Sequence, residues 1–306
     1  MRGLQVVLYH HLADEPSELT DELAVSTSPA LFEAHVRRLA RDYDVVDLDT
    51  VLSGRLPKRA LLITFDDGYR SVLEIAAPIL ARLGLPSVFF VSAAFLNPGS
   101  LPLDNLLCLL ARRIGVDSVG RAINCPAASL NDLFGVVAGL QYARRTALTG
   151  ELAERFQIDC ARLREESGLF LDRSELPRLV DLGCEVGNHT RSHLFCRAIT
   201  DEAAGSIELV EHKQQLEQWS GAPVRAFSYP YGRRIDATPY VERLLRESGH
   251  EATFLVESRP NPRRGARTWN RVSLQDRPVS RLGLELELLP RLRAVKDLVR
   301  PVAVRR

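Results

Sequence analysis

The chain has 306 residues, enough for one large α/β domain or two ordinary ones. Its composition, 45% hydrophobic and 26% charged, is that of an ordinary globular protein. The 40 Lys and Arg against 39 Asp and Glu give a net charge of +1, so the sequence lacks the overall electrostatic footprint of nucleic-acid binding. The five cysteines are odd in number and form no C-x-x-C pair, which argues against a zinc ribbon or a disulfide framework.

No window is long and apolar enough to predict a transmembrane span. The first residues have neither the apolar length nor the cleavage site of a secretory signal. We therefore expect a reducing, cytoplasmic setting and a single domain over residues 1–306.

The first part of the chain alternates short apolar runs with helical patterns. Strands are predicted at 4–9, 60–65 and 86–92. Helices are predicted at 28–43, with Ser28 as the cap, and from 69 to Gly84. Continuous apolar strands separated by helices indicate a parallel sheet that is buried on both faces.

Residues from about 98 to 173 show almost only helical sequence patterns, and we interpret this segment as a helical insertion. The alternation then resumes, with helices near 174–183, 200–221 and 238–249, and strands near 184–190, 224–232 and 251–256. A loop over 257–274 leads to a last short strand, and 284–306 is predicted to be a basic amphipathic helix packed on the domain. Six or seven strands in this series favour a barrel-like α/β fold.

Two adjacent carboxylates, Asp66 and Asp67 of "TFDDGY", stand at the end of the second strand. Carboxylates at the end of a buried strand are costly unless they are used, and their mutual repulsion raises the pKa of one of them. The alternative is that Asp67 simply caps the following helix.

A second polar cluster is "GNHTRSH", in which His189 and His193 are spaced i, i+4. On a helical turn this spacing would place both imidazoles on one face, close enough to share a metal. Two nitrogens and one carboxylate oxygen form a three-ligand set that leaves positions open for water and substrate. The alternative is a pair of ordinary polar histidines at a loop.

The segment "FSYPYG", 227–232, follows another predicted strand. Pro230 fixes the backbone and Gly232 permits a tight turn, so the Tyr231 amide could be aimed at a developing oxyanion. The alternative is a loop with ordinary packing aromatics.

Taken in this order, "TFDDGY", H-T-x-x-H and "FSYPYG" resemble the motifs of the polysaccharide deacetylase (NodB-homology) family, carbohydrate esterase family 4. The resemblance covers about residues 4–275, except much of the insertion. It implies a distorted (β/α)7 barrel and a metal-dependent hydrolase that removes N-acetyl groups from amino sugars. It also implies that Asp67, His189 and His193 bind the metal, that Asp66 is the general base, and that the Tyr231 amide supports the oxyanion.

Two departures from the family pattern lead to further predictions. Ser228 occupies the position of an Arg that orients the base, and Arg271 is our candidate substitute. The family's C-terminal catalytic histidine has no counterpart, since no histidine follows residue 250. In the circularly permuted branch a Tyr-His motif on the first strand supplies the acid, and Tyr9-His10 is similar to it, which makes His10 the candidate general acid.

We accordingly predict a divalent-metal-dependent deacetylase of an N-acylated amino sugar or glycan, with zinc favoured and Co²⁺, Ni²⁺ or Mn²⁺ as alternatives. Other hypotheses are a deformylase or deacetylase of a lipid-linked or small-molecule sugar, and a non-catalytic glycan-binding protein on the same scaffold. The histidines His35, His212 and His250 are predicted to be surface or packing residues, and His11 to point away from His10.

Overall fold

The computed structural model describes residues 3–262 and 265–299. The part of the predicted C-terminal helix beyond residue 299 lies outside the described residues. The part before it forms η9 (Leu284–Leu288) and α14 (Leu289–Val299). Among the described residues, the helices are all too short or too polar to span a bilayer.

The core of the molecule is a parallel sheet in the order β10-β9-β8-β7-β6-β5-β1-β11, with β4 added beside β5. Its strands are β1 (Gln5–Tyr9), β4 (Asp44–Val45), β5 (Ala60–Asp67), β6 (Ser87–Val91), β7 (Cys184–Asn188), β8 (Ala226–Ser228), β9 (Ala252–Leu255), β10 (Thr268–Asn270) and β11 (Val272–Ser273). A separate small pair joins β2 (His11–Leu12) to β3 (Ser26–Thr27). The strands β5, β6, β8 and β9 are wholly buried, as the continuous apolar runs predicted, whereas β4 and β10 at the margins are partly exposed.

The two ends of this sheet are joined by one short segment. β10 pairs with β9, and β11, one residue further along the chain, pairs with β1. The segment 268–273 therefore bridges the two edges and brings the sheet close to a closed barrel. This is the distorted (β/α) barrel that the sequence predicted, with Arg271 at the bridge.

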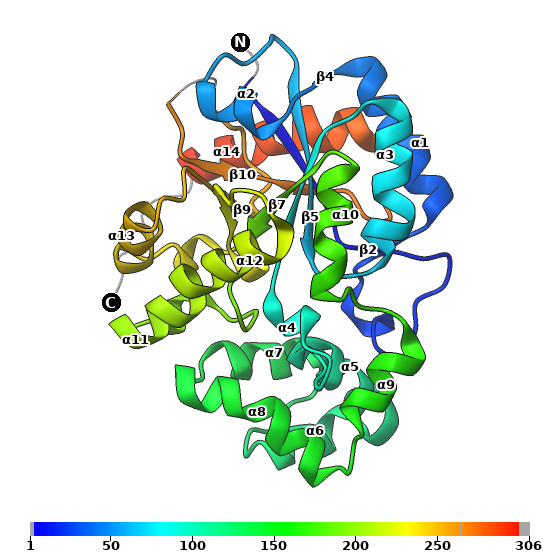
Figure 1. Ribbon diagram of the computed structural model, residues 1–306, viewed down its shortest axis with the longest axis vertical. Helices are drawn as coiled ribbons and strands as arrows, with labels where there is room; N and C mark the ends of the chain where they lie inside the picture. Colours follow the sequence, from blue (N-terminus) through cyan, green and yellow to red (C-terminus); the bar gives the residue numbers. More distant parts are fainter. Residues whose placement is uncertain (1–2, 263–264, 300–306) are drawn as a thin grey trace.

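Helices cover the outside of the barrel (Figure 1). They are α1 (Pro29–Asp42), α2 (Leu48–Ser53), α3 (Ala77–Leu83), α10 (Leu176–Asp181), α11 (Glu202–Gly205), α12 (His212–Ser220) and α13 (Pro239–Glu247). Ser28 caps α1 by accepting a hydrogen bond from the Leu31 amide, as predicted. Two predicted helices contain π-helical stretches: Val72–Ala76 leads into α3, and Ser206–Glu211 joins α11 to α12.

The segment between β6 and β7 is helical and forms a group of its own below the carboxyl ends of the strands (Figure 1). After α4 (Ala93–Leu96) it contains α5 (Leu103–Ile114), α6 (Val116–Ala122), α7 (Leu130–Ala138), α8 (Tyr142–Arg155) and α9 (Cys160–Ser167). These helices have a hydrophobic core of their own, built around Leu106, Leu110, Leu133 and Leu148. Because the carboxyl ends of the strands point toward this group, it lies next to any site formed there.

Candidate active site

The registers of the parallel strands bring the predicted motifs together at one end of the barrel. Tyr9 of β1 lies beside Phe65, so His10 follows at the level of Asp66. Asp67 of β5 lies beside Val91 of β6, and Val91 lies beside Asn188 of β7, immediately before His189. Parallel strands end at the same edge, which is why motifs far apart in the sequence converge here.

Asp67, His189 and His193 form a group whose ligand atoms all lie within 4.8 Å of one another. His189 Nε2 is 3.6 Å and His193 Nε2 is 3.3 Å from Asp67 Oδ1. All three residues are buried. Two imidazole nitrogens and a carboxylate oxygen are the donors that catalytic zinc sites use, so the residues fit a divalent metal.

The other ring nitrogen of each histidine is already engaged. His189 Nδ1 donates to the carbonyl oxygen of Ser228 at 2.8 Å. His193 Nδ1 contacts Asp104 Oδ2 at 2.9 Å. In both cases the hydrogen bond leaves Nε2 free to face Asp67, the arrangement that orients metal-binding histidines.

His189 and His193 do not lie on a helical turn, the conformation in which their spacing would place both imidazoles on one face. The segment between them is a loop, in which Thr190 and His193 have φ of 60° and 49°. The loop is held in place because the Ser192 amide and hydroxyl both donate to the buried Glu208 carboxylate, at 2.9 and 2.7 Å. The two imidazoles converge because this loop is fixed, not because of a helical repeat.

The helix-cap alternative for Asp67 is also wrong. Asp67 ends β5 with φ of 85°, and the following helical segment begins only at Val72, with no side-chain cap. Burial by itself raises the pKa of the Asp67 carboxyl, but hydrogen bonds from His189 and His193 outweigh it and hold the pKa well below its usual range. The carboxylate is thus available in its charged form.

Arg271 forms a bidentate ion pair with Asp66. Its two terminal nitrogens donate to the two carboxylate oxygens, each at 2.6 Å, and the guanidinium is fully buried. Ser228 Oγ, which occupies the family's Arg position, accepts a third bond from Arg271 and donates to Asp66 at 3.2 Å. Burial raises the pKa of Asp66, but the charge and hydrogen bonds of Arg271, together with the nearby His189 and His10, outweigh it, so the pKa lies below its ordinary value.

His10 is half-buried beside this pair, and Gln275 Nε2 is 3.4 Å from its Nδ1. Burial lowers its pKa, and the nearby carboxylates of Asp67 and Asp66 oppose that shift. His11 lies in β2, where its Nδ1 is 2.9 Å from Ser26 Oγ; burial alone lowers its pKa to about 4. Of the two neighbours, it is His10 whose charge is coupled to the aspartates.

The remaining histidines are packing residues, and the surface alternative for them is wrong. His35, His212 and His250 are all buried. His35, for example, contacts the Tyr9 hydroxyl at 3.1 Å.

Tyr231 sits in a strained turn next to the histidine loop. Its φ is 60°, and its ring stacks on Phe195 with the centroids 3.7 Å apart. The following Gly232, with φ of 63°, has no room for a Cβ, which would lie 2.3 Å from the Val256 amide nitrogen. The turn that carries the Tyr231 amide is therefore rigid, as the Pro-Tyr-Gly sequence predicted.

Two site residues were missed by the sequence reasoning, and both come from the helices between β6 and β7. Asp104 of α5 binds His193 and accepts hydrogen bonds from the Tyr231 hydroxyl at 2.9 and 2.8 Å. Arg145 of α8 donates to the His193 carbonyl at 3.0 Å. The available signal was a carboxylate inside the apolar run "LPLDNLLCLL", but an acid in the first turn of a helix is too common to single out.

Comparisons with known proteins agree with these motifs. Residues 145–253 match the family model described as polysaccharide deacetylase; this range includes the histidine loop but not Asp66 and Asp67. No curated protein matches the chain.

Several solved structures share the fold. The Streptococcus pyogenes deacetylase PplD in complex with acetate matches with a TM-score of 0.60 at 14% identity, over 93% of this chain and 98% of that one. IcaB from Ammonifex degensii matches with 0.55 at 20% identity, over 94% and 98%. A polysaccharide deacetylase from Bacillus cereus matches with 0.59 at 16% identity, over 94% and 69%. Residues 145–253 are thus similar to the polysaccharide deacetylases, as the motifs indicated, and the chain shares the fold of the solved structures named here.

Proposed function

We propose that this protein is a divalent-metal-dependent hydrolase that removes N-acetyl groups from an amino sugar or a glycan containing one. The observation that carries the proposal is the adjacency of two units, the Asp67–His189–His193 group and the Asp66–Arg271 ion pair. The first suits a metal, and the second is a carboxylate kept charged, as a general base must be. The match to the deacetylase family model supports the reaction class.

In this proposal each side chain has one task. A divalent ion held by Asp67, His189 and His193 would supply Lewis-acid activation of the acyl carbonyl and of water. Asp66 accepts the proton of the attacking water, and Arg271 keeps that carboxylate ionised and oriented. The Tyr231 amide, in its rigid turn, donates to the oxyanion.

The amine that leaves after amide cleavage needs a proton, and His10 is the candidate donor. Its lowered pKa makes it a readier donor once it is protonated. The relation to the circularly permuted branch stays a prediction, as do the identity of the metal, with zinc favoured, and a cytoplasmic location.

The test is release of acetate or formate from a panel of N-acylated sugars, monomeric, lipid-linked and polymeric, with wild type and Asp66→Asn. We expect acetate release that is lost on chelation, restored by a divalent metal, and about 100-fold or more slower in Asp66→Asn. Formate release instead would make the protein a deformylase. Binding of glycans without release of either acid would identify a binding protein.

A further inference from the structure

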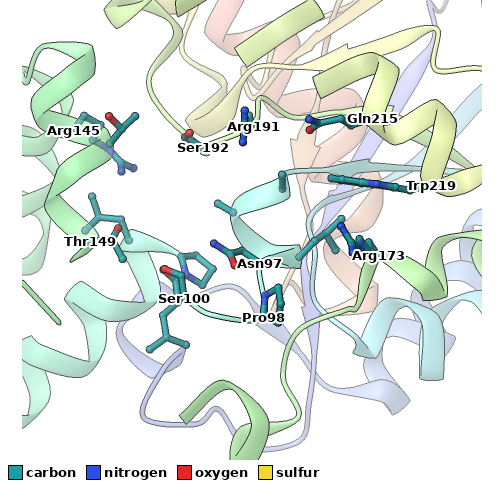
Figure 2. A pocket seen from close by; sticks show the side chains of 17 residues that line it. Asn97, Pro98, Ser100, Arg145, Thr149, Arg173, Arg191, Ser192, Gln215 and Trp219 are labelled. Atoms are coloured by element: carbon teal, nitrogen blue, oxygen red, sulfur yellow. The ribbon is translucent and has the colours of Figure 1, made fainter. Parts of the chain in front are cut away.

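A cavity of about 500 Å³ lies between the inserted helices and the helices that cover the barrel. Arg145 and Thr149 of α8 line one side, and Gln215 and Trp219 of α12 line the other (Figure 2). Ligand pockets commonly have volumes of about 300–1,000 Å³, so this one could enclose a sugar-sized molecule.

The cavity is separate from the candidate metal site, although one loop borders both. Arg191 and Ser192 line the cavity, whereas Asp67, His189 and His193 do not. The loop is anchored there, since the Ala94 amide donates to the Arg191 carbonyl at 2.8 Å. The same five-residue loop thus presents its histidines to the metal site and its middle to this cavity.

The charged lining of the cavity is entirely positive. Arg145, Arg173 and Arg191 line it, and no carboxylate does among the described residues. Within the described residues, the side chains of Arg173 and Arg191 form no hydrogen bond or ion pair. Other surface arginines are commonly paired, as Arg162 is with Glu166. The charges of Arg173 and Arg191 therefore have no ion-pair partner among the described residues, whereas Arg145 lies 3.9 Å from Asp104 Oδ1.

Two of these arginines are held in ways that leave donors free. Arg173 lies over the Trp219 ring, with its guanidinium carbon 6.0 Å from the ring centroid, and an aromatic face takes up none of its N–H groups. Arg145 is only 3% exposed, and its Nη2 donates to the His193 carbonyl and lies 3.9 Å from Asp104 Oδ1. Its Nε has no hydrogen-bond partner among the described residues.

The carboxylate of Glu208 lies behind the 189–193 loop, but its oxygens already accept hydrogen bonds from other residues. Burial raises the pKa of Glu208, and the charge of Arg191 is among the influences that oppose this shift. Its oxygens accept hydrogen bonds from Ser192 and, at 3.1 Å, from the Tyr142 hydroxyl. Glu208 holds the loop and leaves the guanidinium of Arg191 without a hydrogen-bonded partner of its own.

We propose that this cavity binds a sugar that carries an anionic group, a phosphate or a carboxylate. Arginine donors match the oxygens of both groups in geometry and charge. The remaining polar lining, such as Asn97, Thr149 and Gln215, offers amides and hydroxyls that suit sugar hydroxyls. The proposal concerns binding and does not depend on the hydrolytic function proposed above.

The test is isothermal titration calorimetry of the full chain with glucose 6-phosphate, glucuronate, inorganic phosphate and neutral glucose. We expect saturable binding of a charged sugar, with glucose at least about tenfold weaker, because glucose cannot accept charge-assisted hydrogen bonds from the arginines. Comparison of glucose 6-phosphate with glucuronate identifies which anion the site prefers, and inorganic phosphate shows what the anion contributes alone.

The variant that tests the assignment is Arg173→Gln/Arg191→Gln, in which both substituted side chains are exposed. We expect its affinity for the charged sugar to fall by about 100-fold. The matched control is Arg162→Gln/Arg243→Gln, which loses the same charge from two exposed helical ion pairs and should bind as wild type does.

Three outcomes would overturn the proposal. They are the absence of saturable binding of any charged sugar, equal weakening in both double variants, and loss of binding when metal is removed by chelation. The last would place the anion at the metal site. Binding that survives chelation and fails only in Arg173→Gln/Arg191→Gln supports the cavity, whether or not the protein releases acetate.

Discussion

Asp66 and Arg271 are 205 positions apart in the chain, yet they form a buried ion pair with two bonds of 2.6 Å. Removing one member of such a pair leaves an uncompensated buried charge. We expect Arg271→Met to lower the free energy of unfolding by about 3–5 kcal/mol, measured by urea denaturation.

The double variant Asp66→Asn/Arg271→Met is the control for this prediction. Because neither charge then remains, it should recover part of the stability that Arg271→Met loses. If the double variant is destabilised by the sum of the two single changes, the two residues are not coupled as the structure indicates.

His10 and His11 can be separated in the same way. In the proposed mechanism His10→Ala lowers kcat by about 100-fold or more, because the leaving nitrogen loses its proton donor, while bound metal measured by elemental analysis is unchanged. His11→Ala removes a buried side chain that contacts Ser26 and packs against Tyr69, so it should lower stability and spare kcat. Equal loss of kcat in the two variants would contradict the assignment of His10.

At the scale of elements, helix α5 contributes to a site that otherwise belongs to the barrel. Asp104, in the first turn of α5, fixes the ring of His193. We expect Asp104→Asn to weaken metal binding by about 10–100-fold, the usual effect of removing such a partner, in a competition assay against a chelating dye.

Asp117→Asn is the matched control for Asp104→Asn. Asp117 lies in the first turn of α6, another inserted helix, and is exposed in an ion pair with Arg121. Its loss removes the same charge at the same helical position without touching a histidine. Equal metal affinity in wild type and Asp104→Asn would show that the hydrogen bond to His193 does not tune the site.

How much the sequence could predict depends on where each residue lies in its element. The strands and their terminal motifs were predictable, because apolar runs mark buried strands and parallel strands end at one edge. The placement of Arg271 beside Asp66 was also predicted, from the absence of an Arg at Ser228. The conformation of the 189–193 loop was not, since its left-handed residues and its support from Glu208 depend on contacts distant in sequence.

At the scale of the whole molecule, buried histidines couple stability to pH. Burial lowers the pKa of His212 from 6.5 to about 4, and its Nε2 is 3.1 Å from the Val91 carbonyl. In the unfolded chain His212 is protonated below about pH 6.5, whereas in the folded chain it stays neutral down to about pH 4. The contribution of His212 to the free energy of unfolding is therefore constant above about pH 6.5 and decreases as the pH falls from there to about 4.

The stability lost through His212 across this interval is about 3 kcal/mol, because a difference of one pH unit between the folded and unfolded pKa corresponds to about 1.4 kcal/mol. We expect unfolding curves at pH 7 and pH 4.5 to differ less in His212→Gln than in wild type, because the variant cannot take up that proton. An identical difference in the two proteins would mean that His212 is protonated equally in the folded and unfolded states.

The short segment that bridges the two edges of the sheet also sets the order in which the site can be assembled during synthesis. The candidate metal ligands are all translated by residue 193, but the counter-charge of Asp66 emerges only with Arg271. A nascent chain that stops short of this point has an open sheet edge and an unneutralised carboxylate. Pairing of β11 with β1 and neutralisation of Asp66 therefore depend on the same short segment, which links closure of the barrel to readiness of the proposed base.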